Sequence, residues 1–198
     1  MFVQVIEGNV ADRDGLYRQL ERWVSDIRPG ATGYLGSTGG VTEDGRAVLL
    51  ACFESADAAR ANNDRPEQGE WWADTEECFD GPVSFADSED TTMFGAADGA
   101  GFVQVMKGSG ADRERLAAMD EAFEPHMADF RPDLLGGLRV WTGPDSYVEA
   151  AWFTSEAEAR ANEQKEPPAA LAETFGEFSE AMAGVEFLDL REPVVVLA

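Results

Sequence analysis

The chain has 198 residues, which is enough for one large domain or two small domains with a buried core. Apolar residues make up 44% of the sequence, and 39 acidic against 15 basic residues give a net charge of -24, so we expect a folded, strongly acidic protein. Such a surface repels phosphate groups and anionic lipid, which argues against nucleic acid or a membrane as partner. No apolar run reaches the roughly 20 residues of a membrane helix, the N-terminus lacks the basic start of a signal peptide, and the two cysteines suit a reducing compartment, so we expect a cytoplasmic protein.

The first half of the chain predicts strands and helices in the order β-α-β-β-α-β. Asp12 can cap the first helix, Arg28-Pro29-Gly30 ends it, and Ser55 can cap the second helix. A further helical piece follows Pro66 and ends at Gly81-Pro82. The expected strands cover 2–7, 32–41, 47–53 and 83–86, and the second helix covers 56–63.

The second half repeats the first half in the same order over its whole length, which chance does not explain. It predicts the same elements, with a third strand at 147–153 and a later helical piece from Pro167 to about Met182. Pro125 predicts a break or kink in the first helix of this copy near Phe123. The chain closes with an added strand at 193–197, whose shorter counterpart lies at 91–94. The matched segments are 2–5 with 102–105, 11–13 with 111–113, 28–29 with 131–132, 53–55 with 153–155, 59–62 with 159–162 and 83–85 with 185–187.

Each half is therefore expected to be a ferredoxin-like unit of the α+β class. In the first strand Phe2, Gln4 and Ile6 face one side of the sheet and Val3 and Val5 the other, so both faces are apolar and need burial. Helices cover only one face of the sheet in such a unit. If the uncovered faces of the two units pack against each other, both are buried, and the chain forms one intramolecular pseudo-dimeric α+β barrel. Because the second copy fills the place of a partner, we expect a monomer or a weak homodimer. The expected division is a first unit at 1–94, a linker at 95–101 and a second unit at 102–198.

Several short segments stand at equivalent places in the two halves: Gly8 and Gly108 end the first strands, Arg28-Pro29-Gly30 and Arg131-Pro132-Asp133 precede the second strands, and Phe53-Glu54-Ser55 and Phe153-Thr154-Ser155 precede the second helices. With these segments and the turn Asp44-Gly45, the chain resembles the dimeric α+β barrel superfamily in a tandem form, and within it the antibiotic-biosynthesis-monooxygenase-like domains. That superfamily includes cofactor-free quinol oxygenases, haem-degrading enzymes and lactone isomerases. The resemblance therefore implies the fold and leaves the reaction open.

The resemblance does not extend to the haem-degrading members, which have an Asn on the first strand, a Trp ending the third strand and a His on the later helix. Here glutamine occupies the first strand of each copy, Phe53 and Phe153 occupy the aromatic position, and the later helices contain no His. Axial ligation of haem needs a nitrogen, sulfur or phenolate donor, so we expect no haem and no other cofactor. His126 is the single histidine, and with no second His or Cys at ligand spacing it predicts a half-exposed helix residue and no metal site.

Four amide side chains are candidate catalytic residues, namely Gln4, Asn62, Gln104 and Asn162. An amide on the central strand of a sheet buried on both faces must find partners. Gln4 and Gln104 are therefore either a structural pair or hydrogen-bond donors to a ligand carbonyl or to oxygen. Asn62 and Asn162 either serve the helix alone or face a cavity between helices and sheet.

Trp71, Trp72 and Phe79 form an aromatic patch on the later helix of the first copy, and they are candidate ligand-binding residues. The alternative is core packing at helical spacing. The second copy has Leu171 in this region and alone carries Trp141, Tyr147 and Trp152. Large aromatic side chains carry much of the contact energy of a ligand, so this divergence predicts that at most one copy binds ligand, with the first copy favoured.

The sequence leaves three functional hypotheses open. The first is a cofactor-independent monooxygenase-like enzyme that acts on a flat aromatic or quinol small molecule. The alternative is a small-ligand-binding or accessory barrel protein without enzymatic activity, and the third is a structural protein with filled cavities. An open cavity distinguishes the first two from the third, and oxygen uptake distinguishes an enzyme from a binding protein.

Overall fold

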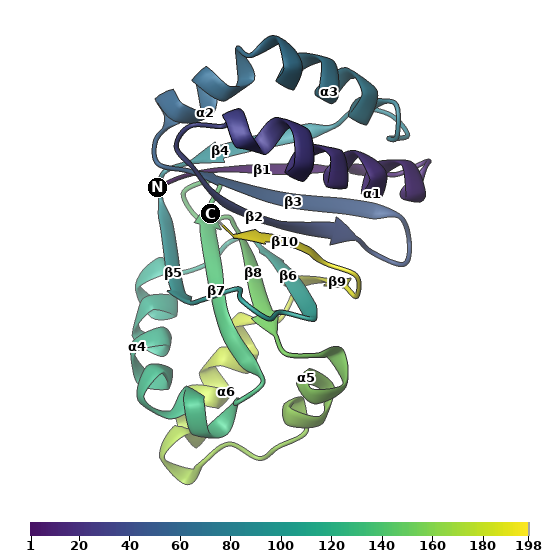
Figure 1. The fold of residues 1–198 in the computed structure, drawn as a ribbon. Coiled ribbons are helices and arrows are strands. Elements are labelled where there is room, and N and C mark those ends of the chain that lie inside the picture. The colour runs from purple at the N-terminus through teal and green to yellow at the C-terminus, as the bar shows by residue number, and fades with distance from the viewer. Residues whose placement is uncertain (198) are drawn as a thin grey trace. The chain divides into compact units, whose positions relative to one another are not determined.

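The structure is a computed structural model that describes residues 1–197, so the end of the expected second unit at 198 lies outside the described residues (Figure 1). The first repeat has the predicted β-α-β-β-α-β order. Its strands are β1 (Phe2–Asn9), β2 (Tyr34–Val41), β3 (Arg46–Phe53) and β4 (Ser84–Ser88), and its α-helices are α1 (Arg13–Arg22), α2 (Ala56–Asn63) and α3 (Pro66–Glu76).

The second repeat has the same order of elements, which confirms the α+β class and the two tandem ferredoxin-like units. In both repeats the strand order in the sheet is that of the ferredoxin-like fold, β4-β1-β3-β2 and β9-β6-β8-β7. The strands of the second repeat are β6 (Phe102–Gly108), β7 (Leu134–Trp141), β8 (Tyr147–Phe153) and β9 (Glu186–Leu190), and its helices are α4 (Arg113–Phe130), α5 (Glu156–Glu163), the short 3-10 helix η3 (Ala169–Leu171) and α6 (Ala172–Ala181).

Each sheet has a fifth strand that comes from the other repeat. Strand β10 (Val194–Leu197) at the end of the chain pairs with β2, and β5 (Thr91–Gly95) pairs with β7. Both segments were expected to be strands, and they are (Figure 1). As a result, the compact units do not coincide with the repeats. One unit comprises Met1–Thr91 with the described residues from Leu190 on, and the other comprises Thr92–Asp189. The sequence suggests instead a first unit that ends at 94, a linker at 95–101 and a second unit that begins at 102.

Side-chain caps fix where the helices begin. The Asp12 carboxylate accepts a hydrogen bond from the Gly15 amide at 2.8 Å, and the Ser55 hydroxyl accepts one from the Ala58 amide at 3.2 Å, as the sequence predicts. Asp112 caps the second repeat's first helix in the same way. The shared caps start the equivalent helices of the two repeats at equivalent residues.

The first helices of the two repeats end differently. After α1 the first repeat continues as a π-helix, η1 (Trp23–Ile27), and a 3-10 turn, η2 (Arg28–Gly30). In the second repeat the sequence predicts a break or a kink near Phe123, and the structure has no break, because α4 runs as one helix through Pro125. Proline removes one backbone donor, so a kink at this place stays a prediction.

Phe79 belongs to the hydrophobic core of the first unit. It packs with Leu16, Leu20 and Cys78, and a Cβ placed on Gly8 would come within 2.6 Å of its ring. Core packing therefore accounts for this residue. Both cysteines are buried free thiols. Over residues 1–197, no helix combines the length and apolarity required to span a bilayer.

The pairing of β10 with β2 gives a direct prediction. We expect a chain that ends after Glu192 to lose protection against hydrogen exchange in 36–39, the segment of β2 that pairs with β10. The amides shared by β1 and β3 should remain protected, because that pairing does not involve β10. Strand β7, which has β5 as its outer neighbour, serves as the internal control. Unchanged exchange in β2 after the truncation would contradict the strand assignment.

Candidate functional site

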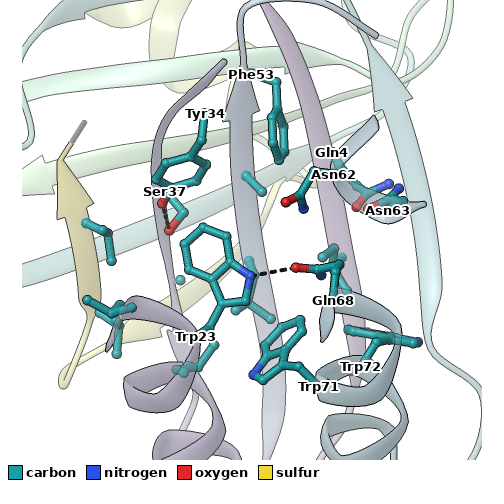
Figure 2. Close-up of a pocket in the computed structure, with 18 of the residues that line it drawn as sticks. Gln4, Trp23, Tyr34, Ser37, Phe53, Asn62, Asn63, Gln68, Trp71 and Trp72 are labelled. Atoms are coloured by element: carbon teal, nitrogen blue, oxygen red, sulfur yellow. Dashed lines mark hydrogen bonds between the residues drawn. The ribbon is translucent and has the colours of Figure 1, made fainter. Parts of the chain in front are cut away.

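The first unit encloses a cavity of about 400 Å³ on the helix-covered side of its sheet (Figure 2). This volume falls in the range of small-molecule binding sites. Strands β1, β2 and β3 supply its floor, α1, η1, α2 and α3 cover it, and β4 and β10 contribute its sides. Its aliphatic lining is Ile6, Leu20, Val24, Leu49, Val194 and Val196.

Six aromatic side chains line the cavity. Adjacent rings meet edge to face or tilted, with centroids 4.8 Å apart for Trp23 and Tyr34, 5.9 Å for Trp71 and Trp72, and 5.3 Å for Trp72 and Phe85. Phe85 is 49% exposed and lies on the edge strand β4, so the cavity reaches the surface beside it. A wall of this kind suits a flat apolar ligand. The six residues are Trp23, Tyr34, Phe53, Trp71, Trp72 and Phe85.

Hydrogen bonds hold two of the indoles in place. Trp23 lies on the π-helix and donates its Nε1–H to Gln68 Oε1 at 2.9 Å. Trp71 donates its Nε1–H to the Gln19 carbonyl at 2.8 Å. Because both indole donors are used by the protein, a ligand meets these side chains through their rings. A π-turn at a functional site is a common arrangement, and here it presents Trp23 and Val24 to the cavity.

The polar lining is uncharged. It consists of amides, hydroxyls and one phenol, and none of the lining residues in the described chain is Asp, Glu, Lys, Arg or His. The Tyr34 hydroxyl donates to Ser37 Oγ at 2.7 Å, and burial raises the pKa of Tyr34 to about 12. Tyr34 is therefore a neutral phenol at physiological pH. The polar lining residues are Gln4, Tyr34, Ser37, Asn62, Asn63 and Gln68.

The corresponding region of the second repeat contains an ion cluster, in which Arg139 and Glu149 have side chains that are each 11% exposed and Asp120 reaches solvent. Sheet pairing aligns Gly39–Leu49 with Arg139–Glu149, and the helix positions of Leu20 and Asp120 correspond in the same way. Three apolar cavity positions are thus charged in the second unit. Arg139 Nε donates to Glu149 Oε2 at 2.6 Å, and Arg139 Nη1 donates to Asp120 Oδ2 at 2.6 Å.

In this cluster one cation lies between two carboxylates, and burial and these charges together shift the pKa values of Arg139 and Glu149. Burial raises the pKa of the Glu149 carboxyl, and the Arg139 guanidinium opposes this effect. Burial also disfavours the charged form of Arg139, but the Glu149 and Asp120 carboxylates outweigh it and raise the pKa of the guanidinium. The Arg139 guanidinium thus lies between the Glu149 and Asp120 carboxylates, at the positions whose equivalents line the cavity of the first unit.

Phenylalanines pack between α4 and α6 in the second unit. The Phe123 ring lies 5.6 Å from that of Phe178 and 6.4 Å from that of Phe175, and the Phe130 ring lies 6.1 Å from that of Phe175. These rings pack against one another, whereas the tryptophans of the first unit surround open volume.

Four of the residues singled out in the sequence lie together in this cavity, namely Gln4, Asn62, Trp71 and Trp72 (Figure 2). Phe79, the third residue of the aromatic patch, is in the core and does not line it. The other two candidates belong to the second unit and bond to the protein. Gln104 Nε2 donates to Asp189 Oδ1 at 2.9 Å, and Asn162 Nδ2 donates to the Glu158 carbonyl at 2.9 Å.

Sequence reasoning missed three important lining residues. Trp23 lies on the π-helix that follows α1, and the sequence gives no sign of that π-helix. Tyr34 and Gln68 belong to no sequence motif that would mark them as lining residues. A comparison of the two copies could have pointed to Tyr34, because Tyr34 pairs with Phe53 in the first copy and Leu134 pairs with Phe153 in the second.

Comparison with solved structures covers both repeats at once. A protein named as a presumed monooxygenase from Fusobacterium nucleatum matches with a TM-score of 0.76 and 10% identity over 99% of this chain and 94% of its own. A similarly named protein from Lactobacillus acidophilus matches with a TM-score of 0.69 and 12% identity over 98% of both chains. An anthrone oxidase-like protein matches with a TM-score of 0.60 and 10% identity over 98% of this chain and 93% of its own.

The chain shares the fold of these proteins. The resemblance to α+β barrel proteins of the monooxygenase-like kind, inferred from the sequence, is thus confirmed at the level of the fold and over the whole chain. No family model matches the sequence, and no curated protein matches it. At these identities the fold is shared while the chemistry is not specified.

The ion cluster of the second unit gives a second prediction. Replacing Glu149 alone by Leu leaves the Arg139 guanidinium with Asp120 as its carboxylate partner, so we expect a loss of about 1.5–3 kcal/mol in the free energy of unfolding. Replacing Arg139 and Glu149 together by Leu removes both charges and should cost less than the single change. Chemical denaturation of the two variants measures the difference. A double variant as unstable as the single one would contradict the role given to the ion pair.

Proposed function

We propose that the first unit binds a flat aromatic or quinol molecule in this cavity and oxidises it as a cofactor-independent monooxygenase-like enzyme. The observation that supports the binding most strongly is the cavity of about 400 Å³ with six aromatic side chains and an uncharged polar lining. Aromatic walls favour a planar ligand, and neutral amides match its carbonyl and hydroxyl groups. The shared fold with proteins named as monooxygenases supports the class of reaction.

The ligand is expected in the first unit alone. In the second unit, the equivalents of Leu20, Gly39 and Leu49 are the ion-paired Asp120, Arg139 and Glu149. A flat apolar ligand at that place would have to separate buried opposite charges, which is costly. One chain should therefore carry one active cavity, with the second repeat in a structural role.

The proposed reaction needs no bound redox group, because the substrate supplies the electrons. With an anthrone as substrate, the ring CH₂ carbon becomes a carbonyl and molecular oxygen is consumed. One oxygen atom enters the new carbonyl and the other leaves as water, so four electrons pass from the organic molecule to oxygen. The protein's contribution is to hold the ring system and to stabilise the negative charge that develops on the carbonyl oxygen as the CH₂ carbon loses a proton.

A second candidate function is binding without catalysis. It is favoured by one observation, which is that the lining contains no side chain that titrates near neutral pH, and the Tyr34 phenol is held protonated. A general base in the usual sense is therefore missing from the wall. An enzyme with this cavity would depend on a substrate acidic enough to lose its proton without such a base.

The test is oxygen uptake with anthrone and with hydroquinone as substrates. The proposal expects uptake above the spontaneous rate and, with anthrone, formation of anthraquinone in equal amount. We expect Trp72→Ala to reduce both binding and uptake at least tenfold, because it removes a ring that borders the cavity and contacts Phe85.

The matched control is a tryptophan of the second unit. Trp152 is almost fully buried on β8, so Trp152→Phe is preferred to Trp152→Ala, and it should leave binding and uptake nearly unchanged. Binding without uptake would favour the second candidate function. Equal losses in the Trp72 and Trp152 variants would contradict the assignment of the site to the first unit.

A further inference from the structure

Two amides of the cavity are held by groups that can only donate hydrogen bonds. Trp23 Nε1 donates to Gln68 Oε1 at 2.9 Å, and Arg65 Nη1 donates to Asn62 Oδ1 at 2.8 Å. Neither an indole nor a guanidinium can accept, so each amide must present its oxygen to that partner. The NH₂ group of each amide is then the end left for other partners. Asn62 is 3% exposed and Gln68 9% exposed, and both line the cavity (Figure 2).

Arg65 is itself fixed from several sides. Its Nη2 donates to the Ile27 carbonyl at 3.0 Å, and its Nε donates to Glu67 Oε1 at 3.0 Å. Its side chain is 17% exposed, and a Cβ on Gly30 would collide with it. The guanidinium thus connects the end of η1 to the start of α3, and Asn62 is attached to a rigid group.

In Gln4 the amide is turned the other way, so that its NH₂ group is bonded to the protein. Its Nε2 donates to Asp87 Oδ1 at 3.1 Å, and a carboxylate can only accept. Its oxygen is therefore the free end. The cavity wall offers hydrogen-bond donors at Asn62 and Gln68 and an acceptor at Gln4, with no charged side chain among its lining residues within 1–197.

The second repeat lacks this arrangement at the equivalent asparagine. Asn162 donates one N–H of its Nδ2 to the Glu158 carbonyl at 2.9 Å, so its NH₂ group is turned toward its own helix. Lys165 occupies the position that corresponds to Arg65. A lysine lacks the planar fork with which Arg65 bonds Asn62, Glu67 and the Ile27 carbonyl together.

We propose that Arg65 and Trp23 are positioning residues that turn the NH₂ groups of Asn62 and Gln68 toward one oxygen of the ligand, so that the cavity binds a phenolate in preference to the neutral phenol. The proposal rests on the function proposed above, that this cavity holds a flat aromatic molecule. Two fixed donors stabilise a developing oxygen anion without adding a charge to the site. The charged groups bonded to these amides are Arg65, behind Asn62, and Asp87, behind Gln4, with Glu67 beyond Arg65.

The probe for this preference is 2-hydroxyanthraquinone, a flat molecule whose visible spectrum changes when its phenol ionises. Absorbance titrations below and above the phenol's pKa give the dissociation constants of the neutral and ionised forms, and their ratio is the readout. Gln68→Glu and Asn62→Asp keep the bonds to Trp23 and Arg65 but replace the NH₂ donor by a carboxylate oxygen. We expect each to reduce the preference for the phenolate at least tenfold.

The positioning residues are tested through the same ratio. Trp23→Phe and Arg65→Lys leave the amides in place but release their orientation, so they should lower the preference for the phenolate by a smaller factor. Asn162→Asp, in the second repeat, should not change it. The ratio cancels a general loss of packing, because such a loss weakens both forms of the probe alike.

The outcomes separate this proposal from the proposed function. If the probe binds and the ratio is the same in the wild type, Gln68→Glu and Trp23→Phe, the positioning role is wrong and the binding function stands. If the wild-type chain fails to bind the probe in either form, the proposed function is wrong and the positioning role with it.

Discussion

The antiparallel pairing of β2 with β3, and of β7 with β8 in the same register, determines which side chains lie together under the helices of each repeat. It places Gly39 beside Leu49 in one unit and Arg139 beside Glu149 in the other, on the side of the sheet that the helices cover. Apolar residues there leave a cavity of about 400 Å³, whereas the charged residues reach one another and Asp120. A shared backbone thus carries an open site in one repeat and an ion cluster in the other.

The exchange of edge strands makes the site depend on both repeats. Val194 and Val196 on β10 line the cavity of the first unit, although they lie near the C-terminal end of the chain. The remaining lining comes from residues 4–85. The final strand of the second repeat therefore contributes to the cavity of the first repeat.

The sequence predicted the fold well because the repeat, the helix caps at Asp12 and Ser55, and the strand alternation are local signals. It also brought Gln4, Asn62, Trp71 and Trp72 forward as candidates, and these four lie in one cavity. It could not place Trp23, because this residue lies on a π-helix. A π-helix has i→i+5 hydrogen bonds where an α-helix has i→i+4 bonds, and no residue pattern in the sequence predicts the change. Phe79 was grouped with the tryptophans by helical spacing alone, while its contact with Gly8 is a tertiary feature.

One repeat has an open cavity, and we infer that the charged residues at the equivalent positions of the other repeat exclude an apolar ligand. Calorimetric titration of the whole chain with anthraquinone counts the binding sites without relying on any variant or on turnover. We expect one site per chain. Two equivalent sites per chain would contradict this inference, because the ion cluster of Asp120, Arg139 and Glu149 would then not exclude the ligand.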